Sequence, residues 1–146
     1  MQLKEIEALK NAAIRVGSVF KMVFYPKDGI TPKGESAVDR TKYFVIAGID
    51  SEGNYIGAAI INTDINMNFT HEIAPYQHCI YPDKYAFLNG KYRYVDCYKL
   101  REIEKLRIAN KAEYIDCLDV DDIDKIRMLL KSSPTTDPCT IEQYNL

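Results

Sequence analysis

Two short polar segments flank one predicted hairpin and carry the best candidates for chemistry. The first, residues 35–42, places Glu35, Asp39, Arg40 and Lys42 just before an apolar run, and the second, Asn62-Thr63-Asp64, follows the next apolar run. A guanidinium, carboxylates and a hydroxyl in such positions are candidates for a functional site. The same residues would also suit an exposed ion pair at a strand entrance, which needs no function.

The hairpin that would position these groups has a clear pattern. Residues 43–49 and 55–62 are runs of β-branched, aromatic and other apolar residues, which are typical of buried strands. The connection between them, Asp50-Ser51-Glu52-Gly53-Asn54, consists of turn-forming residues. An antiparallel hairpin is therefore predicted.

The register of this hairpin decides which side chains meet. If residues 50 and 55 pair, counting outward along both strands places Tyr43 opposite Asn62. Arg40 and Lys42 would then lie close to Thr63. We therefore expect an arginine, a carboxylate and a hydroxyl to share one edge of the sheet.

The remaining elements follow from apolar periodicity. Helical spacing predicts an amphipathic helix in residues 1–16 that ends at Gly17. The pattern predicts strands at 18–25, 76–80, 92–98 and 113–118, and a closing helix at 120–132 with Asp119 as its N-cap. Residues 99–110 fit either a helix or an edge strand.

These elements define a fold class and a domain organisation. A chain of 146 residues fits one domain. Several short strands with turn signals between them predict a mainly β (β+α) fold, a small SH3-like barrel with an N-terminal helix and a C-terminal helix. We expect an N-terminal helix at 1–16, the barrel with its closing helix at 17–132, and a flexible tail at 133–146.

Composition narrows the classes of function. The chain is 47% hydrophobic and 27% charged, as in ordinary globular proteins, which excludes a disordered chain. Its net charge of -2 excludes a basic field over the whole surface, so nucleic acid would have to bind at a local basic patch. No apolar run approaches the ~20 residues of a membrane span, and no signal peptide is recognisable. We expect a cytoplasmic protein without a membrane partner.

Metal and cofactor motifs are missing from the sequence. The four cysteines have no C-x-x-C spacing, and no H-E-x-x-H pair or phosphate-binding glycine loop occurs. We therefore expect no metal and no cofactor. His71, in a polar loop, is either a general base or a solvated side chain, whereas His78, in a predicted strand, suits a structural role.

Several motifs occur in an order and spacing that resembles one family of small β proteins. They are Val16-Gly17-Ser18-Val19-Phe20 continuing to Phe24-Tyr25-Pro26, Asp39-Arg40 leading into Tyr43-Phe44-Val45-Ile46, Ile60-Ile61-Asn62-Thr63, Tyr94-Val95-Asp96-Cys97 with Lys99-Leu100-Arg101-Glu102-Ile103, and the closing segment 118–130. Together they run from about Gly17 to Ser132 and resemble the MazF/PemK (Kid-like) toxin family. The chain departs from the family pattern at Ser18, where Asp is usual, and at Thr41, where Pro usually follows the Arg.

The resemblance implies a function and a set of catalytic residues. Proteins of this family are metal-independent endoribonuclease toxins of type II toxin–antitoxin systems. They are usually homodimers, each is paired with a cognate antitoxin, and they cleave single-stranded RNA by attack of the ribose 2′-OH on the adjacent phosphorus. By this resemblance Arg40 would stabilise the pentavalent phosphate or deliver a proton, Thr63 would orient the phosphate, and Glu35 would act as general base.

The same resemblance implies RNA contacts around these residues. Lys33 and Lys42 would contact phosphates, and Tyr43 would offer a stacking surface. Asp64 stands where the family has a second hydroxyl, which places a carboxylate next to the bound RNA.

Two other functional classes stay open at the level of sequence. The first is a non-catalytic SH3-like module, of mobile-element origin, that binds protein or RNA through the same groove. The second is a phage or mobile-element accessory protein whose barrel serves assembly. Neither requires Arg40 to act on a phosphate.

Overall fold

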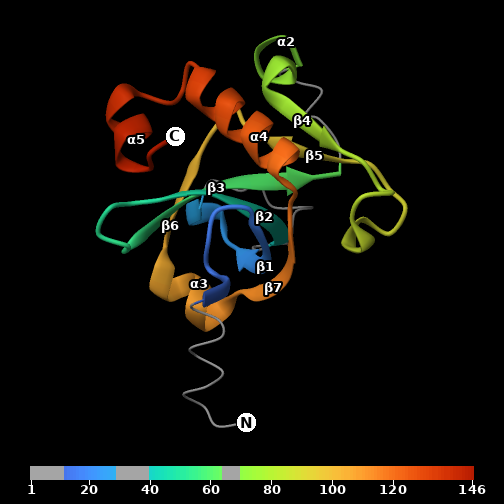
Figure 1. The fold of residues 1–146 in the computed structure, drawn as a ribbon, viewed down its shortest axis with the longest axis horizontal. Helices are drawn as coiled ribbons and strands as arrows, with labels where there is room; N and C mark the ends of the chain where they lie inside the picture. Colours follow the sequence, from blue (N-terminus) through green and yellow to red (C-terminus); the bar gives the residue numbers. More distant parts are fainter. Residues whose placement is uncertain (1–11, 29–39, 64–69) are drawn as a thin grey trace, which may run out of the picture.

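The computed structural model describes residues 12–28, 40–63 and 70–146. The helix predicted at 1–16 lies almost wholly outside these residues. Within them the chain is mainly an antiparallel β-sheet with a few helices (Figure 1).

The described elements follow the predicted order closely. They are β1 (Ser18–Phe24), η1 (Pro26–Asp28), β2 (Arg40–Ile49), β3 (Tyr55–Asn62), α2 (Thr70–Ile73), η3 (Ala74–Tyr76), β4 (Gln77–Ile80), η4 (Ala86–Leu88), β5 (Arg93–Asp96), β6 (Arg101–Glu104), α3 (Lys105–Lys111), β7 (Glu113–Cys117), α4 (Val120–Ser132) and α5 (Pro138–Gln143). The ambiguous segment 99–110 contains both a strand, β6, and most of a helix, α3.

One sheet holds all seven of these strands. Its order is β4-β5-β3-β2-β1-β7, and every pairing is antiparallel. β6 pairs with the first half of β3, whereas β5 pairs with its last two residues. β3 is therefore the strand through which the β1-β2-β3 meander connects to the rest of the sheet.

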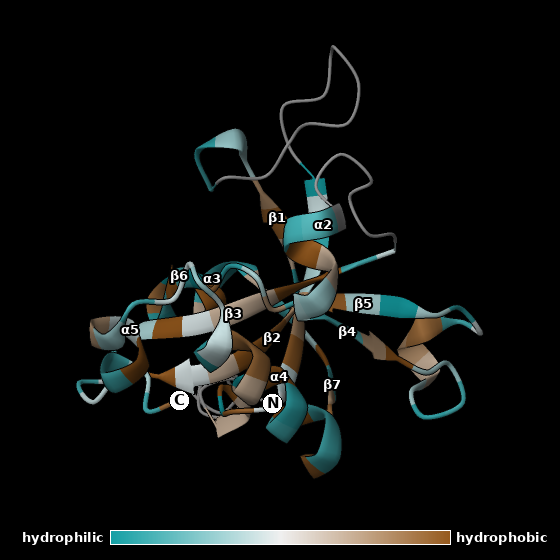
Figure 2. Cartoon of the chain, turned by 90° about the horizontal axis from the view of Figure 1, so that it is seen from above, coloured by the Kyte–Doolittle hydropathy of each residue, from teal (hydrophilic) through white to brown (hydrophobic). Residues whose placement is uncertain are grey.

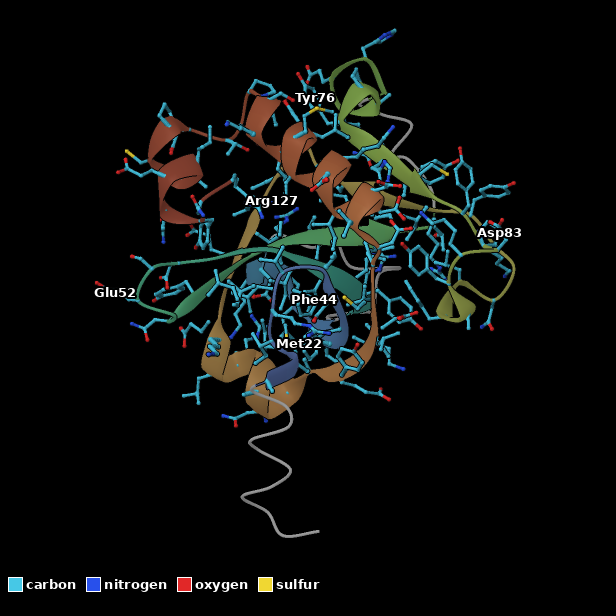
Figure 3. The ribbon with its side chains drawn as sticks, viewed as in Figure 1. Met22, Phe44, Glu52, Tyr76, Asp83 and Arg127 are labelled. Carbon is cyan, nitrogen blue, oxygen red and sulfur yellow. The ribbon has the colours of Figure 1, made fainter. Side chains whose placement is uncertain are left out.

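Side chains alternate across a strand, so successive residues of the central strands face opposite sides of the sheet. Both sides are buried. Phe44 and Ile46 of β2 pack into one core with α3, and Val45 and Ala47 pack into a second core with α4. Figure 1 shows α3 and α4 on opposite sides of the sheet, and Figure 2 shows apolar residues concentrated on the central strands. In Figure 3, Met22 and Phe44 lie inside the molecule while Glu52 and Asp83 lie at its rim.

The start of α4 confirms the predicted N-cap. The Asp119 carboxylate accepts a hydrogen bond of 2.9 Å from the backbone N–H of Asp122. Asp121 and Asp122 occupy the first turn, where negative charge is favourable for the helix dipole. α4 then ends at Ser132, as its apolar stripe predicts.

The expectation of a flexible tail at 133–146 is wrong. These residues form α5, capped by Asp137, and the chain folds back so that Tyr144 is only 1% exposed. Tyr144 packs on Gly48 and Gly57, where a Cβ would lie 2.5 Å from the Tyr144 carbonyl oxygen and 3.1 Å from its Cγ, respectively. The absence of side chains at these two paired glycines makes room for the aromatic ring.

We expect Tyr144→Ala to lower the free energy of unfolding by about 3 kcal/mol, because it removes a fully buried ring. Tyr144→Phe keeps the ring and should stay within about 1 kcal/mol of wild type. Urea unfolding of the three proteins, followed by circular dichroism, measures both effects. Equal stability of wild type and Tyr144→Ala would show that this segment does not stabilise the fold.

Candidate functional site

The predicted meeting of two polar segments occurs, but one residue out of the expected register. Ile49 pairs with Ile56, yet Tyr43 pairs with Ile61 rather than Asn62. The cause is an irregularity between Ile46 and Gly48, a β-bulge that inserts one residue into β2. The strand pattern gave no sign of this extra residue.

The shifted register brings Lys42, not Arg40, against the end of β3. Continuing the pairing by one residue places Lys42 opposite Asn62, and the Lys42 Nζ donates a 2.6 Å hydrogen bond to the Asn62 Oδ1. Arg40 begins β2 and pairs with Phe24 of β1. Alternation along β2 puts Arg40 and Lys42 on the same face of the sheet.

A second group of side chains lies on the opposite face of this edge. The Arg93 guanidinium lies over the Tyr43 ring, with Cζ 5.6 Å from the ring centroid. Phe87 contacts the same ring, with centroids 5.4 Å apart. Because β5 pairs Tyr94 with Asn62, Arg93 is the next residue along and comes opposite Thr63.

We call this region the basic edge: the start of β2, the end of β3 and the start of β5. Its cationic side chains, all half-buried, are Arg40 and Lys42 on one face of the sheet and Arg93 on the opposite face. Thr63 follows β3 directly and is exposed. The face with Lys42 and Asn62 suits a phosphate, and the face where Arg93 lies over Tyr43 suits an anion with a flat ring attached.

Four of the seven site residues predicted from the sequence lie within the described ranges. Arg40, Lys42, Tyr43 and Thr63 all lie at the same end of the β2–β3 pair. Lys33, Glu35 and Asp64 lie outside the described residues. The roles assigned to all seven stay predictions.

Asn62, Phe87 and Arg93 belong to the basic edge and were missed as site residues. Asn62 was named only as part of its segment, because the register prediction placed Tyr43, and not Lys42, opposite it. Arg93 opens a predicted strand, but nothing local shows that this strand pairs with the end of β3. The separation between Asn62 and Tyr94 in the sequence hides this contact.

A buried carboxylate, Asp122, anchors the segment that carries Phe87. Its oxygens accept hydrogen bonds from the Tyr85 hydroxyl at 2.5 Å and from the Lys84 Nζ at 2.7 Å, and lie 2.7 Å from the His78 Nε2. Asp122 is 6% exposed. The contact gives His78 the structural role expected of it.

The charge state of Asp122 follows from these contacts. Burial alone would raise the pKa of this carboxyl, but the hydrogen bonds from Lys84, Tyr85 and His78 outweigh burial and lower its pKa to about 2. The pKa of Lys84 is raised by its bonds to Asp119 and Asp122. Asp122 is therefore a carboxylate at neutral pH and ties α4 to β4 and to the segment before η4.

This anchor is connected to the basic edge through aromatic contacts. Tyr85 lies against Phe87, with ring centroids 6.0 Å apart, and Phe87 lies against Tyr43. The Tyr85 hydroxyl also accepts a hydrogen bond from the Asp119 N–H. α4 therefore helps to fix the ring on which Arg93 rests.

Across residues 12–28, 40–63 and 70–146, no group of three or more His, Cys, Asp and Glu side chains is arranged to hold a metal ion. None of the helices in these ranges has the length and apolar character needed to cross a membrane.

Comparison with known proteins identifies a similar fold. No protein-family model matches the chain, and no curated protein matches it. Among solved structures, a chain from the crystal structure of MazE-MazF (Form-III) from Deinococcus radiodurans matches with a TM-score of 0.51 at 14% identity, covering 82% of this chain and 94% of that one. The fold is MazF-like, and at this identity the match is evidence for the fold alone.

We expect the Asp122 carboxylate to stabilise the fold above pH 4 and to lose this effect as the pH falls to about 2. The pKa of this group is lowered in the folded state, so the unfolded chain takes up the proton first. The shift corresponds to about 2 kcal/mol. Urea unfolding at pH 7, 4 and 2.5 measures it.

Asp122→Asn should be less stable than wild type at pH 7, and the difference should shrink as the pH falls. The exposed Asp124, on the same helix, provides the matched control, since Asp124→Asn should follow the wild-type pH profile. A constant difference between wild type and Asp122→Asn across this range would contradict the assignment.

Proposed function

We propose that this protein is a MazF/PemK-like endoribonuclease toxin of a type II toxin–antitoxin system that cleaves single-stranded RNA without a metal. The observation that carries the proposal is the basic edge, where Lys42 meets Asn62 and Arg93 lies over Tyr43. Its support is twofold. The fold resembles that of a chain from a MazE-MazF crystal structure, and the edge provides groups suited to RNA.

The basic edge matches the chemistry of an RNA backbone. Cations on the two faces of the edge can neutralise phosphates of an RNA strand, and an arginine can bind one phosphate through two N–H groups. Tyr43 and Phe87 provide aromatic faces, which stack with bases irrespective of sequence. Because the protein carries a net charge of -2, these local cations must direct the RNA to this edge.

The proposed reaction needs no metal and no cofactor. The ribose 2′-oxygen attacks the adjacent phosphorus and loses its proton to Glu35, the proposed base. A 2′,3′-cyclic phosphate forms as the bond from phosphorus to the 5′-oxygen breaks, and the leaving oxygen takes a proton from a group at the edge or from water. Arg40 and Lys42 stabilise the extra negative charge on the oxygens bound to phosphorus. Thr63 orients one of these oxygens.

The proposed toxin would work as an assembly with a second copy of itself and with an antitoxin. We infer that the described sheet is an SH3-like barrel, that the protein acts as a cytoplasmic homodimer, and that a cognate antitoxin covers the basic edge. The MazE-MazF neighbour supports an antitoxin partner, since that structure contains both proteins. An antitoxin segment with acidic side chains would complement the cations at the edge.

We expect the purified protein to cleave single-stranded RNA and to leave DNA of the same sequence intact, because the nucleophile is the 2′-OH. Arg40→Ala should lower the cleavage rate by about 10²-fold or more, and Lys42→Ala by about tenfold. Cleavage should be unchanged by EDTA. Gel electrophoresis of a labelled oligonucleotide measures each rate.

Lys125→Ala, an exposed lysine on α4, is the matched control and should keep the wild-type rate. Intact RNA after incubation with wild type would reject the nuclease. If wild type still retards the RNA in a native gel, and Arg40→Ala does not, the non-catalytic binding module is the better assignment. The Tyr43, Phe87 and Arg93 contacts would serve that module equally well.

A further inference from the structure

A cavity of about 440 Å³ shares no lining residue with the basic edge. It is bordered by η1, the start of β6, and the segment 135–140 that leads into α5. Cavities of this size hold small organic ligands, whose typical sites span about 300–1,000 Å³. The cavity exists because the C-terminal residues fold back over the sheet.

The wall of the cavity carries more positive than negative charge. Four of its residues are cationic, Lys27, Lys99, Arg101 and Arg107, and two are acidic, Asp28 and Glu102. Arg107 and Asp28 form a bidentate pair, with both N···O distances 2.8 Å. The hydrogen bond from Arg107 keeps the pKa of Asp28 low, so this pair adds no net charge. The rest of the wall then has three cationic side chains, Lys27, Lys99 and Arg101, and one carboxylate, Glu102.

The wall also holds hydrogen-bond donors that the fold does not satisfy. Thr135, Thr136 and Thr140 line it together with Arg101. The Thr136 Oγ1 and the Arg101 Nε are buried and have no hydrogen-bond partner among the described residues. Leaving such groups unpaired costs free energy, which an acceptor atom of a ligand would recover after a side-chain rotation that turns them toward the cavity. Oxygens of a phosphate are acceptors of the right charge.

The remaining wall is apolar. Phe24 and Ile103 are almost fully buried, and Leu100 is half-buried beside them. An apolar wall next to a cationic one suits a ligand with a flat or aliphatic part attached to an anion. A bare inorganic ion would use only half of the site.

We propose that this cavity binds a nucleoside phosphate, with its phosphate at Lys99, Arg101 and Thr136 and its base or sugar against Leu100. The ligand is either a free nucleotide or the phosphorylated end of an RNA chain, since both present the same group. The proposal goes beyond RNA cleavage and does not require it. None of the residues assigned to the basic edge holds the ligand.

Isothermal titration calorimetry of the full chain with AMP, adenosine and inorganic phosphate tests the site. We expect saturable binding of AMP and binding of adenosine and phosphate at least about tenfold weaker, because each lacks half of the contacts. Lys99→Gln and Thr136→Val should each weaken AMP binding by about five- to tenfold. Lys125→Gln, the same charge change at an exposed position outside the cavity, should leave it unchanged.

A 5′-phosphorylated RNA trinucleotide separates the two sources of the ligand. Tighter binding of the trinucleotide than of AMP indicates an RNA end, and the reverse indicates a free nucleotide. No saturable binding of either, or equal affinities for Lys99→Gln and Lys125→Gln, would overturn the proposal. Because calorimetry measures binding and not cleavage, the cavity can be tested even if the protein does not cleave RNA.

Discussion

The antiparallel pairing of β2 with β3 is the constraint on which the site depends. Both strands are buried on two faces, so a shift of one residue would move every side chain to the wrong core. The bulge near Ala47 accommodates one extra residue without losing either core. The bulge also sets the register in which Lys42, and not Arg40, contacts Asn62 at the end of β3.

Residues far from β2 and β3 in the sequence position the aromatic side chains of the basic edge. Asp122 fixes Tyr85, Tyr85 contacts Phe87, and Phe87 packs on Tyr43, so a helix far along the sequence positions a ring at the edge. β5 brings Arg93 to the same ring. The fold shared with a chain of a MazE-MazF structure provides the scaffold, whereas the chemistry proposed here depends on these side chains.

Local sequence signals predicted the elements well and the long-range pairings poorly. The turn at 50–54 and the Asp119 cap act over a few residues, and both occur as predicted. The bulge has no such signature, since Ala47 fits a regular strand. The tail at 133–146 is ordered and not flexible as predicted. Asp137 followed by Pro138 is a local helix start, whereas the burial of Tyr144 against two glycines depends on residues far away in the sequence.

The most direct test of the central claim is to map where single-stranded RNA contacts the protein. Titration of ¹⁵N-labelled protein with a 2′-O-methyl oligonucleotide, which lacks the nucleophile, keeps the complex intact for NMR. We expect the largest chemical-shift changes at Lys42, Tyr43, Thr63 and Arg93, and small changes along α4. Changes confined to α4, or no changes at saturating RNA, would contradict an RNA-binding role for this edge.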